Sequence, residues 1–377
     1  MKGVVILGST GSIGRQTLEV ISAFPEQCAV RGLAANTNRD LLLQQAWATR
    51  PAGIWCGEGI EGDALPPGTR PVARMEDLVD LPGVDLLVVA TVGLAGLGPT
   101  LAGLRRGIPV ALANKEGMVV AGALLMEEAA RSRTPILPID SEPSAIWQCL
   151  QGEPHPPSRL ILTASGGAFR TRPLHELATV TPEEALRHPT WKMGKKITLD
   201  SATLINKAFE VIEAHWLFGV PWERIEVVLH PQSIVHSMVE FPDGSVKAQL
   251  GVPDMRLPIQ YALFYPQRVP NASLPRLDFS KALTLTFEPV DPERYPCFQL
   301  AVEAGRKGGS YPAVVNGADE AAVDLFLQGR IPFTHIPRLL RHALEAHTPI
   351  AHPSLEELLE ASAWAFREVV RVATEGR

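Results

Sequence analysis

Gly3-Val4-Val5-Ile6-Leu7-Gly8-Ser9-Thr10-Gly11-Ser12-Ile13-Gly14 is the stretch that decides the fold of this 377-residue chain. Its first residues form a largely apolar run that predicts a strand, and residues 13–24 have the apolar spacing of a helix. Glycines between a strand and a helix let the backbone approach a pyrophosphate, and the helix N-terminus offers N–H donors and a positive dipole end. The spacing is GxxGxxG rather than GxGxxG. The strand–loop–helix context therefore favours a dinucleotide-binding loop, with a structural glycine-rich turn as the alternative.

The pattern of a strand followed by a helix continues through the first 140 or so residues. Apolar runs at 29–35, 85–90, 109–113 and 134–139 predict further strands, and residues 40–49 predict a helix. Two of these runs are continuous in Val, Leu and Ala, as expected for parallel strands covered on both faces. We therefore predict an α/β fold whose N-terminal part is a doubly wound, Rossmann-like parallel sheet.

The alternation of strand and helix patterns ends near residue 140. Short strand-like runs occur at 159–163, 197–199, 225–229, 234–241 and 245–252, and the last three look antiparallel. Prolines punctuate the chain from 266, and the pattern is helical from 291. We predict a nucleotide-binding domain at 1–140, an α+β catalytic domain with a small sheet at 141–265, a linker at 266–290 and a C-terminal helical domain at 291–377.

Charge and composition limit the partners of the chain. Its net charge of −6 and pI of about 6.0 argue against a chain-wide electrostatic grip on nucleic acid. The longest apolar stretch, residues 84–92, is far shorter than the ~20 residues of a membrane helix, and the N-terminus lacks an export signal. We expect a cytoplasmic protein with no nucleic-acid or membrane partner. Because the cysteines are scattered, we expect four buried thiols: Cys28, Cys56, Cys149 and Cys297.

The second predicted strand indicates which nucleotide binds. An NAD site usually carries Asp or Glu at the end of this strand, where the carboxylate binds the ribose 2′-hydroxyl. Here no carboxylate occurs between residue 30 and Asp40, whereas Arg31 and Arg39 could accept a 2′-phosphate. The sequence therefore favours NADP over NAD, with Arg39 as an ordinary solvated charge as the alternative.

Two carboxylates follow the strand at 134–139. Asp140 and Glu142 are two residues apart, so in an extended chain both would point to the same side. Two oxygen ligands at a strand end suit Mg²⁺ or Mn²⁺. The alternative is that Asp140 or Ser141 caps a helix.

A second polar cluster lies at residues 200–210. Asn206, Lys207 and Glu210 are three or four residues apart and would share one face of a helix. In the functional interpretation, Ser201, Asn206 and Lys207 donate to a phosphate while Glu210 joins the first two carboxylates on a metal. In the alternative, Ser201 caps a helix that carries a surface Lys–Glu pair.

Three further groups follow predicted strands or carry ligand-binding residue types. Ser165 with Gly166-Gly167 could form an anion-binding nest or an ordinary turn. Lys115 follows the strand at 109–113 and could face a ligand or lie in a solvated loop. The basic loop 188–196 carries Trp191 and Met193, which could close over a ligand or pack on the core.

Seven motifs in order give the chain a resemblance to a known family. They are GSTGSIG, ANKE, DSEPSA, ASGGAFR, HPTWKMGKK, DSATLINKAFE and HPQSIVHS, and together they span most of the chain. The chain resembles the 1-deoxy-D-xylulose 5-phosphate reductoisomerase family. The resemblance implies an NADPH-dependent oxidoreductase and isomerase that uses a divalent metal (Mg²⁺, Mn²⁺ or Co²⁺). Its substrate would be a phosphorylated ketose, its product 2-C-methyl-D-erythritol 4-phosphate, its pathway isoprenoid precursor biosynthesis, and its assembly a homodimer formed through the β domain.

The resemblance also implies roles for individual residues. The implied metal ligands are Asp140, Glu142 and Glu210. The implied substrate contacts are Lys115, Ser141, Glu142, Ser165, His188, Trp191, Ser201, Asn206, Lys207 and Glu210, of which Lys115, Glu142, His188 and Glu210 would be catalytic. The implied NADPH contacts are Thr10, Gly11, Ser12, Ile13, Asn36, Thr37, Asn38, Asn114, Glu116, Met193 and Gly194.

One loop departs from the common family form. Where many members have Gly-Lys-Asn, this chain has Asn36-Thr37-Asn38, so the lysine expected at the 2′-phosphate is missing. Selectivity for NADPH is therefore expected to be weaker or to shift to Arg39.

Two other classes of function share features with this sequence. The nearest enzyme alternative is another NADP-linked aldehyde, semialdehyde or homoserine-type reductase, and the non-enzyme alternative is an NADP-sensing module. An acyl-enzyme semialdehyde dehydrogenase needs a nucleophilic cysteine beside a base, and no cysteine here has such a sequence setting. A sensing module has no need of three carboxylates with a Ser/Asn/Lys set. Metal-dependent consumption of NADPH distinguishes all of these.

Overall fold

The strand predicted at the N-terminus is β1 (Lys2–Leu7), and it lies inside a seven-stranded sheet of the order β4-β3-β2-β1-β5-β6-β7. The structure, a computed structural model, describes residues 1–191 and 193–375. All paired strands of this sheet run parallel. The other strands are β2 (Cys28–Ala35), β3 (Gly53–Cys56), β4 (Arg70–Pro71), β5 (Leu86–Val89), β6 (Val110–Leu112) and β7 (Ile136–Pro138). The doubly wound parallel sheet predicted from the sequence is confirmed.

The order of the strands fixes where a ligand binds. From β1 the chain builds outward through β2, β3 and β4, and then returns to the other side of β1 with β5. Leu7, the last residue of β1, lies beside Ala34 of β2 and Val89 of β5. The order therefore reverses at β1, and open α/β sheets bind ligands at the carboxyl end of the strands at such a reversal. The glycine-rich loop begins at that point, at Gly8.

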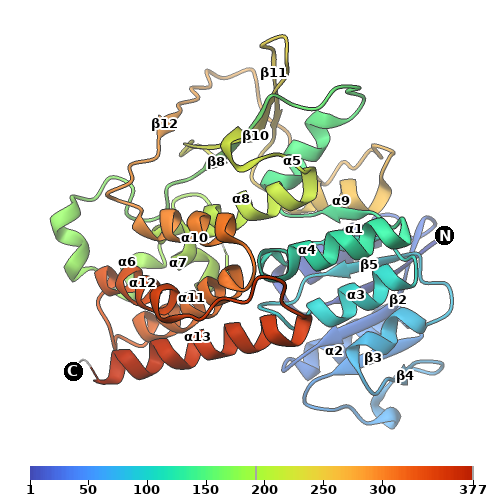
Figure 1. Cartoon of the computed structure of the whole chain (residues 1–377). Helices are drawn as coiled ribbons and strands as arrows, with labels where there is room; N and C mark the ends of the chain where they lie inside the picture. Colours follow the sequence, from blue (N-terminus) through green and yellow to red (C-terminus); the bar gives the residue numbers. More distant parts are fainter. Residues whose placement is uncertain (192, 376–377) are drawn as a thin grey trace. The chain divides into compact units, whose positions relative to one another are not determined.

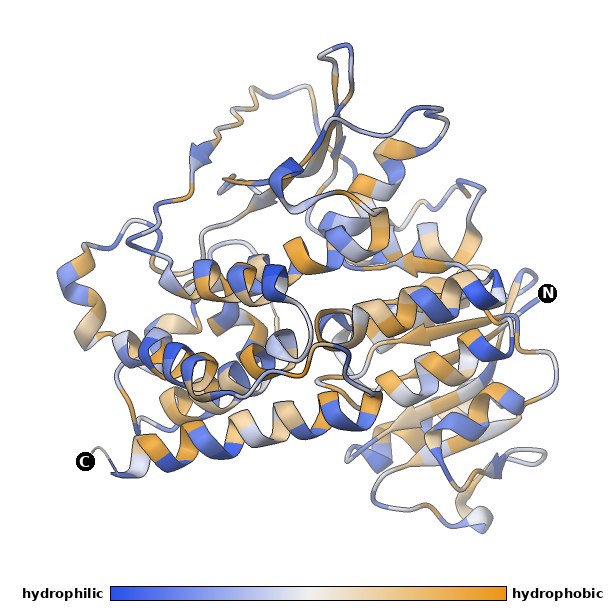
Figure 2. Cartoon of the chain, viewed as in Figure 1, coloured by the Kyte–Doolittle hydropathy of each residue, from blue (hydrophilic) through white to orange (hydrophobic). Residues whose placement is uncertain are grey.

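Apolar strands and amphipathic helices make the core of this part. Residues 4–7 of β1 are fully buried, and the strands of the sheet are mostly orange in Figure 2. The helices that accompany the sheet are α1 (Ser12–Ser22), α2 (Arg39–Thr49), α3 (Leu97–Arg105) and α4 (Lys115–Ser132) (Figure 1). A later helix, α9 (Arg256–Phe264), packs against α1, β6 and β7. A continuous parallel sheet is thus covered by helices, which explains its uninterrupted apolar strands.

The described chain divides into two compact units. The first consists of Met1–Gly117, Ala123–Ser144 and Asp254–Pro275, and the second of the remaining described residues. The first unit includes 254–275 because α9 packs on the parallel sheet. The division into segments 1–140, 141–265, 266–290 and 291–377 stays a prediction.

The second unit contains a five-stranded sheet of the order β11-β10-β8-β9-β12. Its strands are β8 (Arg159–Ala164), β9 (Ile225–Leu229), β10 (Val235–Glu240), β11 (Val246–Leu250) and β12 (Glu288–Pro289). Strand β10 is antiparallel to β11, as predicted, and it is also antiparallel to β8. Strand β9 was expected beside these antiparallel strands, but β8 lies between β9 and β10, and β9 pairs with β8 in parallel. The helices between β8 and β9 supply the long crossover that a parallel pair requires.

The helices of this crossover carry the second polar cluster. They are α6 (Pro182–Ala185), α7 (Lys195–Thr203) and α8 (Ile205–Phe218). The strand predicted at 197–199 is wrong, because these residues lie inside α7, which packs against α8 and later helices. Ser201 does not cap the next helix: it lies within α7, and its hydroxyl donates to the carbonyl of Ile197 at 2.9 Å.

The C-terminal part is helical, as predicted. Its helices are α10 (Pro296–Lys307), α11 (Tyr311–Leu327), α12 (Ile336–Ala346) and α13 (Leu355–Glu375), and α5 (Ser141–Leu150) precedes β8. Ser354 and Glu357 form a capping box before α13. Polar and apolar residues alternate along α13 in Figure 2. Short 3₁₀ turns occur at Gly62–Ala64, Met75–Asp80, Leu174–Thr179, Trp222–Arg224 and Phe333–His335.

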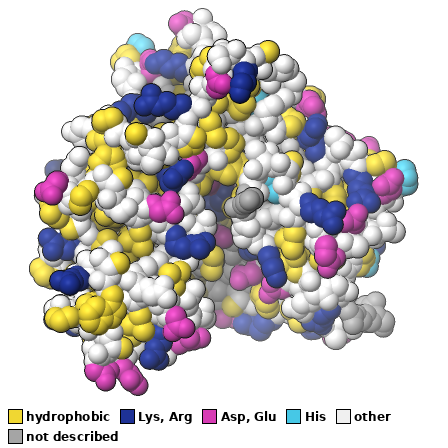
Figure 3. Space-filling model, turned by 180° about the vertical axis from the view of Figure 1, so that it is seen from behind, with side chains coloured by type: hydrophobic (Ala, Val, Ile, Leu, Met, Phe, Trp, Pro, Cys, Tyr) yellow, Lys and Arg dark blue, Asp and Glu magenta, His cyan; other side chains and the backbone are white. Residues whose placement is uncertain are grey.

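The placement of charged side chains and cysteines agrees with what the composition predicts. On the face shown in Figure 3, basic and acidic side chains are interspersed rather than gathered by sign. All four cysteines are buried, as predicted. No helix among the described residues combines the length and the apolar character that crossing a bilayer requires.

Candidate active site

The glycine-rich loop after β1 has the geometry of a pyrophosphate cradle. Gly8 has a φ of +80°, which a residue with a side chain rarely adopts. A Cβ on Gly14 would lie 2.3 Å from the carbonyl oxygen of Gly8, so the first turn of α1 packs directly on the loop. The N-cap residue of α1 is Gly11, which has no side chain to cover the N–H groups of the first turn. The backbone at Thr10, Ser12 and Ile13 therefore presents donors to an anion.

The end of β2 provides the setting for the adenosine ribose. The side chain of Asn38 accepts from the N–H of Leu41 at 3.2 Å and caps α2. Asn36 lies against Gly57, where an added Cβ would be 2.0 Å from its Oδ1. Arg39 is the first residue of α2, whereas Arg31 packs on Gly3 and Gly83, near the opposite end of β1. Of the two arginines weighed from the sequence, only Arg39 lies at the ligand-binding end of the strands.

Asn114 and Lys115 follow β6 and link it to neighbouring strand ends. Asn114 caps α4 by accepting from the N–H of Gly117 at 3.1 Å. Its amide group donates to the carbonyl of Gly93 at 2.8 Å, which ties α4 to the loop after β5. The ammonium of Lys115 lies 2.6 Å from a carboxylate oxygen of Asp140. This ion pair forms because β6 and β7 are parallel neighbours whose ends meet at one edge.

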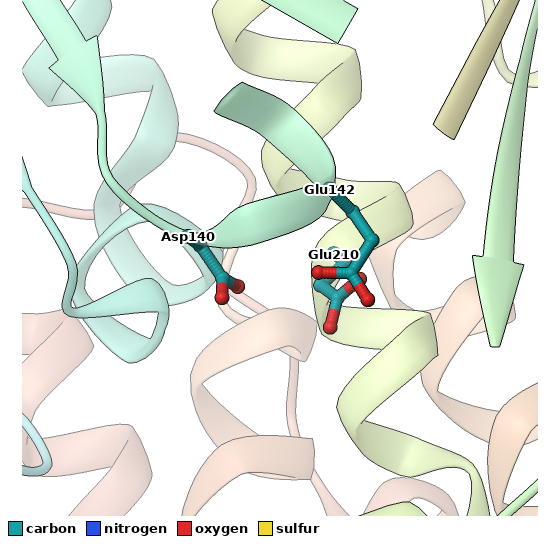
Figure 4. A group of neighbouring side chains, drawn as sticks. All are labelled: Asp140, Glu142 and Glu210. Carbon is teal, nitrogen blue, oxygen red and sulfur yellow. The ribbon is translucent and has the colours of Figure 1, made fainter. Parts of the chain in front are cut away.

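The three carboxylates predicted to hold a metal lie together. Carboxylate oxygens of Asp140, Glu142 and Glu210 are all within 4.8 Å of one another, and Figure 4 shows the three side chains turned toward one another. Ser141 donates to Glu142 at 2.5 Å. Glu210 lies on α8, whose residues Val211 and Ala214 share a core cluster with Ile146 and Cys149 of α5.

The backbone at Asp140 and Glu142 differs from the conformation assumed in this prediction. Asp140 precedes α5 and Glu142 lies in its first turn, so they are not on an extended strand as assumed. The carbonyl of Asp140 accepts from Ser144 at 2.9 Å, as expected of a residue at a helix start, so capping position and ligand position coincide. Three carboxylates this close repel one another, and Lys115 and Lys207 together carry one positive charge fewer than the three carboxylates carry negative ones. Their hard oxygen donors suit Mg²⁺ or Mn²⁺, so the residues present fit a divalent ion.

Asn206, Lys207 and Glu210 of the second cluster share one face of α8, as predicted. Asn206 donates to one oxygen of Glu210 at 2.6 Å, and Lys207 forms an ion pair with the other oxygen. The side chains of Lys207 and Glu210 are only 4% and 1% exposed, so this is not the surface pair that the alternative required. A buried ion pair with an amide donor costs desolvation free energy, which is typical of a functional site.

Ser165 and Ser201 come from neighbouring pieces of backbone. Gly166 and Gly167 after β8 have φ values of +83° and +68°. A Cβ on Gly167 would lie 2.4 Å from the carbonyl oxygen of Ser201, so this loop rests directly on the C-terminal end of α7. The glycines are therefore required for the close approach that brings Ser165 and Ser201 to the same region.

The imidazole of His188 orients the hydroxyl of Ser165. Its Nδ1 accepts from the backbone N–H groups of Thr190 and Trp191 at 3.1 and 2.8 Å. The neutral ring must therefore carry its proton on Nε2, which lies 2.9 Å from Ser165 Oγ. Since Oγ also accepts from the N–H of Gly167 at 3.2 Å, the hydroxyl proton of Ser165 is left to donate to a further acceptor, such as a phosphate oxygen.

Burial keeps this histidine neutral, which predicts a pH dependence. Desolvation lowers the pKa of His188 from its ordinary 6.5 to about 4. Between pH 6.5 and 4 the unfolded chain binds a proton here that the folded chain excludes, so the free energy of unfolding falls as the pH is lowered through this window. The contribution is fully present above pH 6.5. Urea unfolding at several pH values should show a smaller slope for His188→Asn than for the unmodified chain, whereas equal slopes would contradict this assignment.

The loop expected to close over a ligand is only partly anchored on the sheet. The hydroxyl of Thr190 donates to the carbonyl of Pro231 at 3.3 Å, and the ring of Trp191 lies 6.1 Å from that of His236. Met193 is half-buried, and Gly194 is the N-cap of α7 with open space around it. Lys192 of this loop lies outside the described residues.

One buried carboxylate near the site, that of Asp319, was not predicted from the sequence. Asp319 of α11 is fully buried and contacts Lys196 of α7. The available signal was the placement of Asn316 and Asp319, three residues apart, in a helical run rich in Val and Ala. A charged residue in such a run is buried unless the helix is exposed, and it then needs a partner.

Comparisons with known proteins agree over nearly the whole chain. Models described as 1-deoxy-D-xylulose 5-phosphate reductoisomerase and its C-terminal domains match residues 4–122, 136–218 and 250–368. The protein of that name from Pelotomaculum thermopropionicum is 51% identical and covers 99% of this chain and 98% of its own. The one from Heliobacterium modesticaldum is 52% identical and covers 100% and 99%.

Solved structures show the same similarity. The enzyme from Zymomonas mobilis, in complex with NADPH, superposes with a TM-score of 0.90 at 41% identity and covers 99% of both chains. A second reductoisomerase structure, in complex with NADPH, fosmidomycin and magnesium, gives a TM-score of 0.90 at 35% identity and covers 100% of this chain and 98% of that one.

Proposed function

Because the chain belongs to the 1-deoxy-D-xylulose 5-phosphate reductoisomerase family, we propose that it performs the family's reaction. It rearranges 1-deoxy-D-xylulose 5-phosphate and reduces the product with NADPH to 2-C-methyl-D-erythritol 4-phosphate, in isoprenoid precursor biosynthesis. The observation that carries this proposal is the convergence of Asp140, Glu142 and Glu210, with Lys207 and Asn206 on the same helix as Glu210. A metal ligand set next to phosphate donors is what a metal-dependent enzyme acting on a sugar phosphate requires.

The residues have complementary roles in this proposal. Asp140, Glu142 and Glu210 would hold a divalent ion, which supplies Lewis-acid polarisation of neighbouring carbonyl and hydroxyl oxygens. Lys115, held by Asp140, adds positive charge for the oxyanion that develops on the substrate. Ser165, Ser201, Asn206 and Lys207 bind the phosphate, which does not react and whose binding energy positions the rest of the substrate. His188 keeps the hydroxyl of Ser165 pointing outward, and Trp191 with Ser141 completes the substrate contacts.

Most of the cofactor contacts in this proposal come from the first unit. Thr10, Gly11, Ser12 and Ile13 contribute the loop that receives the pyrophosphate, and Asn36, Thr37 and Asn38 surround the ribose. Asn114, Glu116, Met193 and Gly194 are the remaining NADPH contacts implied by the family. Supporting observations are the uncovered N-terminus of α1 and the reversal of strand order at β1.

The test is consumption of NADPH, followed by absorbance, with 1-deoxy-D-xylulose 5-phosphate as substrate. We expect turnover with Mg²⁺ or Mn²⁺ and none in EDTA, with recovery when the metal is restored. Full activity in EDTA would contradict the metal assignment. Oxidation of NADPH with an aldehyde or semialdehyde but not with the ketose phosphate would favour the alternative reductase, which the full-length similarity to reductoisomerases does not support.

Arg39→Ala tests how the chain selects NADPH. Arg39 begins α2 at the ligand-binding end of β2, where no carboxylate is present to bind a ribose hydroxyl. We expect the variant to lose about tenfold in NADPH affinity and nothing in NADH affinity, as for the loss of one charged hydrogen bond. Fluorescence titration with both nucleotides measures this. Arg31→Ala is the matched control, since Arg31 lies near the other end of the strands; equal losses in the two variants would contradict the role of Arg39.

We also propose that the protein is a homodimer in the cytoplasm. Strand β11 is an edge strand, paired only with β10 among the described residues. Its apolar side chains Val246 and Leu250 are 48% and 37% exposed. An exposed edge with apolar side chains is a template for pairing with a second chain. Light scattering after size-exclusion chromatography should give twice the mass of 40.8 kDa, and Val246→Lys should shift it toward the monomer.

A further inference from the structure

A group of three charged side chains joins α7 to α11, with two buried carboxylates and a lysine that is 30% exposed. The ammonium of Lys196, in the first turn of α7, lies 2.6 Å from a carboxylate oxygen of Asp200 and 2.6 Å from one of Asp319. The side chains of Asp200 and Asp319 are 6% and 0% exposed. Asp200 belongs to α7 and Asp319 to α11, so Lys196 links the two helices. We call Lys196, Asp200 and Asp319 the charge triplet.

The triplet is a poor way to stabilise the fold. It contains two buried carboxylates and one partly exposed ammonium, so within the triplet the ionised carboxylates outnumber the cation. Desolvation raises the pKa of Asp319, although Lys196 acts in the opposite direction. Burial, together with the two aspartates, raises the pKa of the neighbouring Cys297, so it stays a neutral thiol and adds no charge to the group. Apolar side chains of similar volume would pack here at a lower cost.

Helix α7 is the support for two predicted phosphate donors. Ser201 follows Asp200 directly, so the position of the triplet sets the position of Ser201. The loop that carries Ser165 rests on the same end of the helix, because Gly167 contacts the backbone of Ser201 and Ala202. A small rotation of α7 would therefore move Ser201 and remove the support under Ser165 at the same time.

We propose that Asp319 is a positioning residue for phosphate binding, acting through Lys196 and Asp200 on α7. This inference rests on the proposed function, because it assumes that Ser165 and Ser201 bind the substrate phosphate. Asp319 itself is fully buried and touches neither substrate nor cofactor in this proposal. Two acceptors on separate helices hold the single ammonium of Lys196 and so select one placement of α7, which an apolar contact would specify less sharply.

Asp319→Asn tests this inference because it keeps the shape of the side chain and removes its charge. We expect the dissociation constant for inorganic phosphate and the KM for the ketose phosphate to rise about tenfold, as when one charged hydrogen bond is weakened. The NADPH dissociation constant and kcat stay within twofold, and the melting temperature is unchanged or higher, because the excess buried charge is gone. Calorimetry with phosphate, steady-state kinetics and thermal melting measure these quantities.

Glu368→Gln is the matched control. Glu368 lies on α13 and contacts His342 of α12 at 2.8 Å and Arg371 of α13 at 2.7 Å, so its ion pairs join α12 to α13. Because Glu368→Gln removes these ion pairs, the variant should have a lower melting temperature and an unchanged affinity for phosphate. The inference is overturned if Asp319→Asn binds phosphate as the unmodified protein does. It is also overturned if phosphate affinity, NADPH affinity and melting temperature all fall together, which would indicate a purely structural role.

The same measurements separate this inference from the proposed function. If the unmodified protein binds phosphate and loses that affinity in Asp319→Asn, but does not turn over the ketose phosphate, the positioning role stands and the proposed reaction fails. If the unmodified protein is active and Asp319→Asn has an unchanged KM, the proposed reaction stands and the positioning role fails.

Discussion

Glu210→Gln lowers kcat/KM at least about a thousandfold, because charge stabilisation by a bound metal is worth several kcal/mol. Glu210 is one of three carboxylates within 4.8 Å of one another, and its side chain is 1% exposed. Glutamine keeps the volume but has no charge, and its amide cannot bind a cation as a carboxylate does. The loss should therefore appear as a weaker affinity for Mn²⁺, and higher Mn²⁺ concentration should recover part of the activity.

Two measurements decide this prediction. Electron paramagnetic resonance counts bound Mn²⁺ without any dependence on turnover, and activity is then measured against Mn²⁺ concentration. Glu226→Gln is the control: it removes one carboxylate from β9, where Glu226 pairs with Arg159 on the surface. An unchanged Mn²⁺ titration in Glu210→Gln would remove this residue from the ligand set, whatever happens to the rate.

The sequence was informative wherever a local pattern determined the structure. The strand–loop–helix at residues 3–24 needs only neighbouring residues, and it forms β1, the loop and α1. The face shared by Asn206, Lys207 and Glu210 also follows from helical spacing alone. The ligand set at Asp140 and Glu142 was predicted with an incorrect local conformation, because the side chains converge from the start of a helix.

The failures concern contacts between distant residues. Residues 197–199 have the composition of a strand, but packing of α7 against α8 and α11 makes them helical. Strand β9 is parallel to β8 because of the crossover helices, which a run of five residues cannot reveal. Asp319 pairs with Lys196 across 123 residues, and no local pattern encodes such a partner. The burial of the Lys207–Glu210 pair was likewise decided by the elements packed around α8.

Lys207→Met separates phosphate binding from metal binding on α8. The ammonium of Lys207 is 4% exposed and pairs with Glu210. Its loss should raise the dissociation constant for inorganic phosphate roughly 10- to 100-fold, the range for one hydrogen bond to a charged group. The KM for the ketose phosphate should rise in parallel, and NADPH affinity should not change, because the cofactor loop belongs to the first unit. Calorimetry with phosphate and with NADPH measures both.

The same variant should respond to metal in the opposite direction from Glu210→Gln. Removing Lys207 takes one positive partner from the buried carboxylate of Glu210, which lowers the melting temperature because a less compensated buried charge is costly. A divalent ion on Glu210 replaces the lost positive charge, so saturating Mn²⁺ should raise the melting temperature of Lys207→Met more than that of the unmodified protein. Glu210→Gln should gain least. If Mn²⁺ stabilised all three proteins equally, Lys207 and the cation would not share the carboxylate of Glu210, and the metal would have to lie elsewhere.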